Sequence, residues 1–240
     1  MTDRVSIETI PNVPFVEAGH DIGDILVNAL LEASIVLEEN DVICIASKAI
    51  SMAEGRVVLL NEVEMSKAAQ EIHSKVPRKD PRTIQLMINE TGDPEGSRIV
   101  LTGNHLAGWL PNGLRLTSAG VDKIDAESVI LLPKDPDASA KAIGNKILSA
   151  TNVNVGIVIT DSDGREDKKG STQLAIGVYG VPPLRKTTAA IATSEETLCD
   201  MLAASAALIM GQRGTNKPAV LIRGVDYTFD PNAKITEALN

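Results

Sequence analysis

A chain of 240 residues, 43% of them apolar and 23% charged, has enough apolar surface to fold around a sizeable core without disulfides. Only 2% of the residues are aromatic, and the net charge is −9 with a pI near 4.9, which disfavours a general binder of nucleic acid or of membrane surfaces. Two isolated cysteines, no bilayer-length apolar stretch and no leader-like N-terminus favour a cytoplasmic protein.

The first part of the chain alternates predicted helices and strands. Apolar residues recur at helical spacing over residues 20–38, and Asp21 is a predicted N-cap. Residues 41–47 (DVICIAS) form a predicted short buried strand. Asp80 followed by Pro81 predicts the start of a second helix, because aspartate caps helices and proline suits the first helical position.

The middle of the chain continues this alternation. Strands are predicted at residues 97–102 and 114–121, on either side of a glycine-rich loop, and a helix over residues 137–149. The strand predicted at 153–160 hardly alternates, so we expect it to be buried on both faces. Residues 172–180 form the next predicted strand.

The C-terminal part contains one more helix and one more strand. Thr193 and Glu196 match a capping box that would begin the helix, and Gly211 is its predicted C-terminal glycine. Residues 218–224 are a predicted final strand. The class is therefore mixed α/β, with a strand order that the sequence leaves open.

The most charge-dense stretch is DSDGREDKKG, residues 161–170, with seven charged residues in ten. It fails the spacing of a calcium-binding EF-hand, because glycine comes fourth and Thr172 would replace the glutamate at position twelve. Two interpretations stay open. The stretch is either a charged surface turn, or a corner where Asp161 and Ser162, at the end of a buried strand, bind Mg²⁺ or Mn²⁺ together with phosphate.

Other segments offer weaker signals for a ligand site. Asp122 closes another strand-like segment, but a Gly-x-Asp turn is common on protein surfaces. The P-loop and dinucleotide glycine motifs are absent, so a nucleotide would need residues 210–217 (MGQRGTNK) or the Ser47-Lys48 pair. The segment 210–217 also fits a helix end followed by a polar loop. The histidines lack zinc spacing, and His73 is expected to be solvated.

Seven segments, in this order, resemble the coenzyme F420-0:L-glutamate ligase family, the gamma-glutamyl ligases of F420 biosynthesis. They are VPFVEAGHDI, SKAISMAEGR, KDPRTIQLMI, LTSAGVDKID, LLPKDPDASA, ITDSDGREDKKGSTQLAIGVYG and MLAASAALIMGQRGTNKPAVLIRG. The resemblance implies a mixed α/β fold of that type, neither P-loop nor Rossmann, in an intertwined homodimer. Residues 1–240 would form one unit, with room for two closely packed subdomains.

The resemblance also implies an activity. GTP would activate the carboxylate of F420-0 as an acyl phosphate, and L-glutamate would then be joined to it through a gamma-glutamyl amide bond. Mg²⁺ or Mn²⁺ would be required, and K⁺ is a further candidate. The partners would be small molecules and a second copy of the chain, with neither nucleic acid nor membrane involved.

The family's binding residues can be carried over to this sequence, whereas no catalytic residue can be assigned. The implied metal ligands are Asp122, Asp161, Ser162 and Gln212. The implied guanine-nucleotide contacts are Val13, Pro14, Phe15, Val16, Ser47, Lys48, Asp125, Met210, Gly211, Gln212, Arg213, Gly214, Thr215, Asn216 and Lys217.

The sequence departs from the family at several of these places. Met52 stands where a nucleotide-contacting lysine is expected, Asp125 where an asparagine is expected, and residues 163–170 lack the usual tryptophan. An aspartate- and glycine-rich segment after residue 185 is missing. Two further hypotheses therefore stay open: a paralogue that uses another amino acid or acceptor, and a nucleotide- or metal-binding homologue without turnover.

Overall fold

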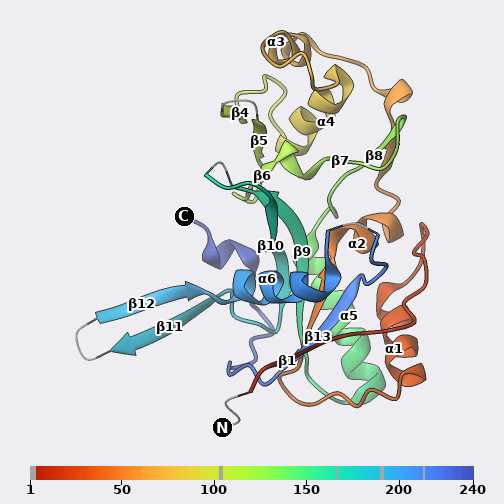
Figure 1. Ribbon diagram of the computed structural model, residues 1–240, viewed down its shortest axis with the longest axis vertical. Coiled ribbons are helices and arrows are strands. Elements are labelled where there is room, and N and C mark those ends of the chain that lie inside the picture. Colours follow the sequence, from red (N-terminus) through yellow and green to blue (C-terminus); the bar gives the residue numbers. More distant parts are fainter. Residues whose placement is uncertain (1–3, 103–104, 166, 190–191, 213) are drawn as a thin grey trace.

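The computed structural model describes residues 4–102, 105–165, 167–189, 192–212 and 214–240 (Figure 1). A five-stranded sheet lies at its centre, in the order β1-β13-β2-β9-β10. The strands are β1 (Ser6–Thr9), β13 (Ala219–Arg223), β2 (Val42–Ala46), β9 (Gly156–Gly164) and β10 (Ser171–Tyr179). Strands β2 and β9 run parallel, whereas every other neighbouring pair is antiparallel. The predicted mixed α/β class is confirmed.

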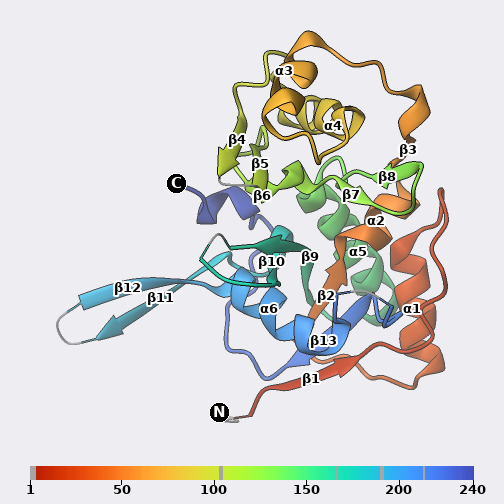
Figure 2. The same ribbon diagram turned by 45° about the horizontal axis from the view of Figure 1, so that its top comes forward.

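Helices cover both faces of this sheet (Figures 1 and 2). Helix α6 (Leu198–Met210) lies on the face that carries Cys44, whose thiol approaches the Leu202 carbonyl. Helix α5 (Pro136–Thr151) lies on the other face, where its Gly144 packs closely against Tyr179, and α1 (Ile22–Glu32) packs against α5. Strand β9 is buried on both faces, as its lack of alternation predicts.

A second group of elements lies beyond one end of the sheet (Figure 1). It contains helices α3 (Lys67–Lys75) and α4 (Pro81–Thr91), the sheet β3-β8-β7 and the sheet β4-β5-β6. The strands are β3 (Val57–Leu59), β4 (Ile99–Thr102), β5 (His105–Trp109), β6 (Arg115–Thr117), β7 (Asp122–Lys123) and β8 (Ser128–Ile130). Its buried side chains, among them Leu60, Ile84, Met87 and Val129, form an apolar cluster of their own.

Short helical turns complete the chain. Helix α2 (Ser47–Ala53) follows β2 directly, and 3₁₀ turns span Leu60–Glu62, Ser118–Gly120 and Ile235–Ala238. Within the described residues, no helix has both the length and the apolar character needed to cross a membrane.

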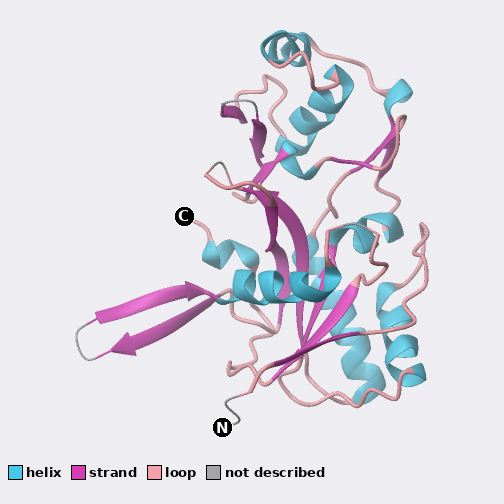
Figure 3. Ribbon diagram, viewed as in Figure 1, coloured by secondary structure: helices cyan, strands magenta, loops and turns pink. Residues whose placement is uncertain are grey.

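A long hairpin projects from the body (Figure 3). Its strands are β11 (Leu184–Ala189) and β12 (Ala192–Thr197), paired antiparallel. The predicted Thr193–Glu196 capping box is wrong, because both residues belong to β12, where Glu196 pairs with Arg185 across the hairpin. Helix α6 begins only after Thr197.

Two predicted boundaries also need correction. The helix predicted over 20–38 has the expected N-cap at Asp21 but ends at Glu32, where Ser34 adopts a positive φ of 55° that a continuing helix cannot contain. The strand predicted to end at residue 160 continues to Gly164. The first four residues of the charge-dense stretch, 161–164, are therefore strand, paired with β10, and the described residues that follow form the turn.

An ion pair joins Asp41, which directly precedes β2, to Arg223, the last residue of β13. Asp41, 1% exposed, accepts hydrogen bonds from Arg223 Nε at 2.8 Å and Nη2 at 2.7 Å, and from the backbone N–H of Glu38 at 2.8 Å. Because Asp41→Ala removes three hydrogen bonds to a buried carboxylate, two of them from a guanidinium, it should lower the free energy of unfolding by about 3 kcal/mol in urea titrations.

The control is Glu38→Gln, because Glu38 pairs with the same guanidinium at 2.8 Å but is 64% exposed. It should change the free energy of unfolding by less than about 1 kcal/mol. Equal losses in the two variants would contradict the account.

Candidate functional site

The parallel pairing of β2 with β9 places two polar side chains together at one edge of the central sheet. Ala46 lies opposite Thr160 in the register, so the next residues, Ser47 and Asp161, leave the paired region side by side. The Ser47 hydroxyl donates a hydrogen bond to Asp161 Oδ1 at 2.7 Å, and both side chains are buried. The acidic stretch and the Ser47-Lys48 segment therefore meet in space.

A second carboxylate joins them from the other group of elements. Asp122 begins β7, and its Oδ2 lies 2.6 Å from Lys48 Nζ. Burial raises the pKa of Asp161 to about 7; the Ser47 hydrogen bond lowers this pKa, the Asp122 charge raises it, and the Lys48 charge lowers it. We call Ser47, Lys48, Asp122 and Asp161 the acidic corner. It contains two carboxylates and one ammonium group, which pairs with Asp122.

Successive side chains of β9 point to opposite faces of the sheet, and this separates the predicted metal ligands Asp161 and Ser162. Asp161 and Asp163 point to one face, where Asp163 Oδ1 accepts a hydrogen bond from the Thr117 N–H at 2.8 Å. Thr160 and Ser162 belong to the opposite face, where the Thr160 hydroxyl approaches Met210 Sδ at 3.8 Å. Ser162 therefore faces α6 and the loop that follows it, rather than the acidic corner.

The loop 210–217 lies at the same edge of the sheet. The N–H of Ala46, the last residue of β2, donates to the carbonyl of Pro218 at 2.8 Å, which fixes the end of the loop beside Ser47. Thr215 Oγ1 donates to the Met210 carbonyl, and Gly211 ends α6 with a φ of 65°. Gln212, Gly214, Thr215, Asn216 and Lys217 are exposed, and Arg213 lies outside the described residues.

The N-terminal segment reaches this region through α2. The Gly19 N–H donates to the Ala53 carbonyl at 2.8 Å at the end of α2. Val16 is buried, Val13 packs against the main core, and Phe15 exposes 78% of its surface. Pro14 is exposed as well. The prediction that residues 13–16 contact a nucleotide stays a prediction.

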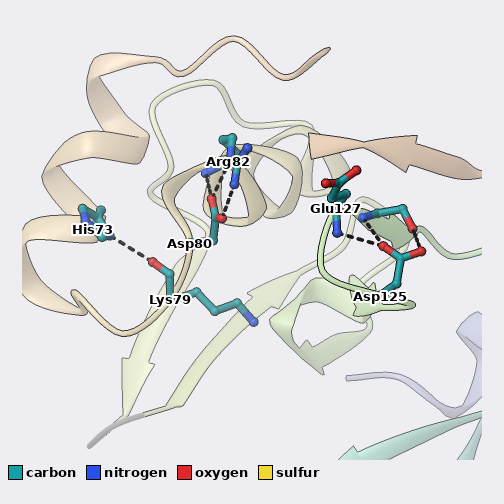
Figure 4. Close-up of polar contacts among 7 residues, drawn as sticks. His73, Lys79, Asp80, Arg82, Asp125 and Glu127 are labelled. Carbon is teal, nitrogen blue, oxygen red and sulfur yellow. Dashed lines mark hydrogen bonds and ion pairs between the residues drawn. The ribbon is translucent and has the colours of Figure 1, made fainter. Parts of the chain in front are cut away.

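Asp125 has a structural role of its own. Its carboxylate accepts hydrogen bonds from the N–H groups of Glu127 and Ser128, each at 2.8 Å, and from the Ser128 hydroxyl at 2.7 Å (Figure 4). The Ser128 hydroxyl, followed by these backbone donors, lowers the Asp125 pKa. Asp125 thus closes the β7–β8 turn, and its predicted nucleotide contact stays a prediction.

Lys79 is a functional candidate that the sequence did not single out. Its Nζ donates to the Ser118 hydroxyl at 2.7 Å; burial lowers its pKa, while the nearby Asp122 raises it. His73, expected to be solvated, is instead half-buried, and its Nδ1 lies 2.9 Å from the Lys79 carbonyl (Figure 4). The sequence feature that could have identified Lys79 is its pairing with Arg78, two cationic residues immediately before the helix cap at Asp80.

The acidic corner suits a hard divalent cation that keeps other oxygen ligands. In the described part of the chain, no group of three or more His, Cys, Asp or Glu side chains is placed to hold a metal. Two carboxylates and a hydroxyl are the sparse oxygen set with which Mg²⁺ or Mn²⁺ binds phosphates. Gln173, paired with Ser162, also has a buried side-chain Oε1 to which none of the described residues donates a hydrogen bond, so this oxygen is unsatisfied by them on the Ser162 face.

Comparison with known proteins places the chain in a family. The F420-0:Gamma-glutamyl ligase family matches residues 11–224. The chain belongs to this family. All seven segments quoted above lie within the matched range, so the recognition from sequence is confirmed.

Three relatives in the family are named coenzyme F420:L-glutamate ligase. The protein from Methanothermobacter thermautotrophicus is 32% identical, over 93% of this chain and 90% of its own length. The protein from Methanopyrus kandleri is 34% identical, over 91% and 86%. The protein from Methanococcus maripaludis strain S2 is 35% identical, over 95% and 92%. The resemblance extends over nearly the whole length of each.

The buried carboxyl of Asp161 generates a pH-dependent prediction. Because its folded pKa of about 7 lies above its ordinary value of 3.8, it stabilises the fold below about pH 4 and loses that contribution as the pH rises through about 7. Asp161→Asn has no titrating carboxyl at this position, so its free energy of unfolding lacks this pH-dependent loss. In metal-free protein with EDTA, the variant should gain about 2 to 3 kcal/mol relative to wild type between pH 5 and pH 8.

Urea unfolding of both proteins at the two pH values measures this difference. All other titrating groups are shared by the two proteins and cancel. Parallel pH profiles for wild type and Asp161→Asn would show that the carboxyl is not destabilised in the fold.

Proposed function

We propose that this protein is a GTP- and divalent-metal-dependent ligase. It joins L-glutamate through a gamma-glutamyl amide bond to coenzyme F420-0, by way of an acyl phosphate. The observation that carries the proposal is the acidic corner at the edge where β2, β9 and the loop 210–217 meet, in a chain that belongs to the F420-0:gamma-glutamyl ligase family.

The reaction divides into two substitutions. A carboxylate oxygen of F420-0 attacks the γ-phosphorus of GTP, and GDP leaves with the electrons of the broken P–O bond. The amine of L-glutamate then attacks the acyl carbon, and inorganic phosphate leaves. Both steps gather negative charge on phosphate oxygens, so the site needs positive charge and N–H donors at the point of transfer.

The residues of the acidic corner would supply this environment. Asp122 and Asp161 would hold Mg²⁺ or Mn²⁺, which when bound neutralises phosphate oxygens. Lys48 already balances Asp122 at 2.6 Å, and it can turn to a phosphate when Asp122 has another cationic partner. Gly214 has a positive φ, a conformation found in backbone anion-binding nests, whereas the Gly211 N–H already donates to the Ala207 carbonyl at 3.0 Å. K⁺ remains a further candidate cofactor.

Ser162 and Gln212 belong to the α6 side of β9 in this proposal. On that side, Ser162, Gln212 and the unsatisfied Gln173 Oε1 would provide oxygen ligands for a second cation or polar contacts for the nucleotide. Met52 cannot replace a lysine, because its half-buried side chain packs against the main core. Lys48 lies four residues earlier on the same face of α2, so one cation remains on that face.

The direct test is a ligation assay with purified protein, GTP, Mn²⁺, L-glutamate and F420-0. Mass spectrometry should detect a product heavier by one glutamate residue, with one GDP released per amide bond. Asp161→Asn should lose at least about a thousandfold in kcat, because the charge that holds the cation is gone.

The matched control is Asp24→Asn, which changes an exposed carboxylate of α1 whose partner is Lys146 of α5, outside the acidic corner. It should keep activity within about tenfold of wild type. Absence of both the product and GDP release would refute the proposal, and full activity in Asp161→Asn would show that the acidic corner is not the metal site.

One observation favours a second candidate, a paralogue that uses a different acceptor. The stretch that departs from the family, residues 163–170, begins at Asp163, whose carboxylate contacts Thr117 next to the acidic corner. A changed stretch there alters the surroundings of an acceptor more than those of the nucleotide. Release of GDP with a carboxylate other than F420-0, and none with F420-0, would favour this candidate.

A further inference from the structure

A polar pocket adjoins the acidic corner on the side of α3 and α4. It has a volume of about 290 Å³, with Val76 and Leu106 as its buried apolar part. Its polar lining consists of Arg78, Lys79, His105, Thr117 and Ser118. The described lining thus combines two cations, an imidazole and two hydroxyls, without a carboxylate, in a protein whose net charge is −9.

The cations are held in place by the loop that carries them. The Lys79 carbonyl lies 2.9 Å from His73 Nδ1, and the Lys79 N–H donates to the Val76 carbonyl at 3.1 Å. Asp80 caps α4 by accepting from the Arg82 N–H at 2.9 Å (Figure 4). With the backbone fixed on both sides, the Lys79 ammonium reaches the Ser118 hydroxyl at 2.7 Å.

The opposite wall is a strained turn. Ser118 and Ala119 have φ values of 55° and 51°, and Gly120 follows with 71°, so three successive residues are left-handed. Residues other than glycine rarely adopt this conformation, and it persists where packing enforces it, often at binding sites. Here Ala119 is fully buried, and the turn leads directly to Asp122 of the acidic corner.

We propose that this pocket binds the phosphate group of the acceptor, while the acceptor's carboxylate lies at the acidic corner. Two adjacent cations, one of them held on a hydroxyl, are the groups that recognise phosphate oxygens. A volume of about 290 Å³ suits one group of a ligand rather than a whole nucleotide. The inference rests on the proposed ligase function, in which the acceptor F420-0 carries a phosphate group.

The place of the pocket favours the acceptor over the nucleotide as the source of the phosphate. All its lining residues belong to the loop between α3 and α4, to β5, and to the end of β6 with its following turn. The predicted nucleotide segments instead belong to the N-terminal segment, α2, the β7–β8 turn and the loop after α6. Of these, α2 and the α6 loop meet at the edge of the central sheet. Asp122 lies between the two regions, linked to Lys48 and electrostatically to Lys79.

The test is calorimetric titration of F420-0 into the full-length protein without GTP or metal. Arg78→Gln and Lys79→Met should each weaken F420-0 binding by about tenfold or more, since each removes one charge-assisted contact. Both should leave GTP affinity within about twofold of wild type. Lys75→Gln is the control: it removes a cation from the same segment, at the exposed end of α3, outside the pocket lining.

The variants separate the possible failures. Because Arg78 is exposed, Arg78→Gln should fold, and it tests the proposed phosphate pocket if Lys79→Met fails to fold. Unchanged F420-0 affinity in the folded variants would overturn the inference, and an equal loss of GTP affinity would assign the pocket to the nucleotide and overturn it too. If wild type neither binds nor ligates F420-0, the proposed function fails, and titration with inorganic phosphate tests the pocket itself. Phosphate binding that both variants abolish supports the pocket; binding that they retain, or none in wild type, overturns it.

Discussion

The parallel pairing of β2 with β9 is the constraint on which the site depends. These strands are far apart in sequence, and their register ends with Ala46 opposite Thr160. Because parallel strands finish at the same edge of a sheet, the residues that follow them are brought together, and Ser47 reaches Asp161. The same edge receives the loop after α6, through the hydrogen bond between Ala46 and Pro218. The parallel register of β2 with β9 and the antiparallel register of β13 with β2 therefore position three segments that the sequence separates.

The electrostatics of the acidic corner fit the cation site that we propose there. Asp161 is buried and close to a second carboxylate, which disfavours its charge, while one lysine balances Asp122. A protein selected for stability alone would avoid this arrangement, because a buried carboxyl with a raised pKa costs free energy at neutral pH. The strained Ser118–Ala119 turn beside it follows the same pattern. Both features lie around Asp122, where the two groups of elements meet.

Local patterns predicted much of this fold. The caps at Asp21 and Asp80, the buried β2 and β9, α5 and the final strand followed from periodicity and capping chemistry. The failures came from tertiary context. Thr193 and Glu196 have the spacing of a capping box, but cross-strand pairing makes them part of a hairpin. Asp161 was expected at the end of its strand, yet pairing with β10 extends β9 to Gly164.

For the site, the sequence supplied the identity of the residues but not their grouping. Resemblance to the family named Asp122, Asp161 and Ser162 together, whereas strand alternation separates Ser162 from the other two. Lys79 was not recognised from the sequence, because its contacts with His73 and Ser118 exist only in the fold, and the Arg78-Lys79 pair alone is a weak signal. Asp125 shows the reverse case, since the residue at a position implied to contact the nucleotide closes a local turn here.

The most direct test of the central claim is a crystal structure of the protein with GDP and Mn²⁺, with the anomalous signal of manganese recorded. We expect a manganese peak between the carboxylates of Asp122 and Asp161, with Lys48 turned from Asp122 toward the nucleotide phosphates. Manganese bound elsewhere, with the Lys48–Asp122 pair intact and GDP remote from the loop 210–217, would contradict the account.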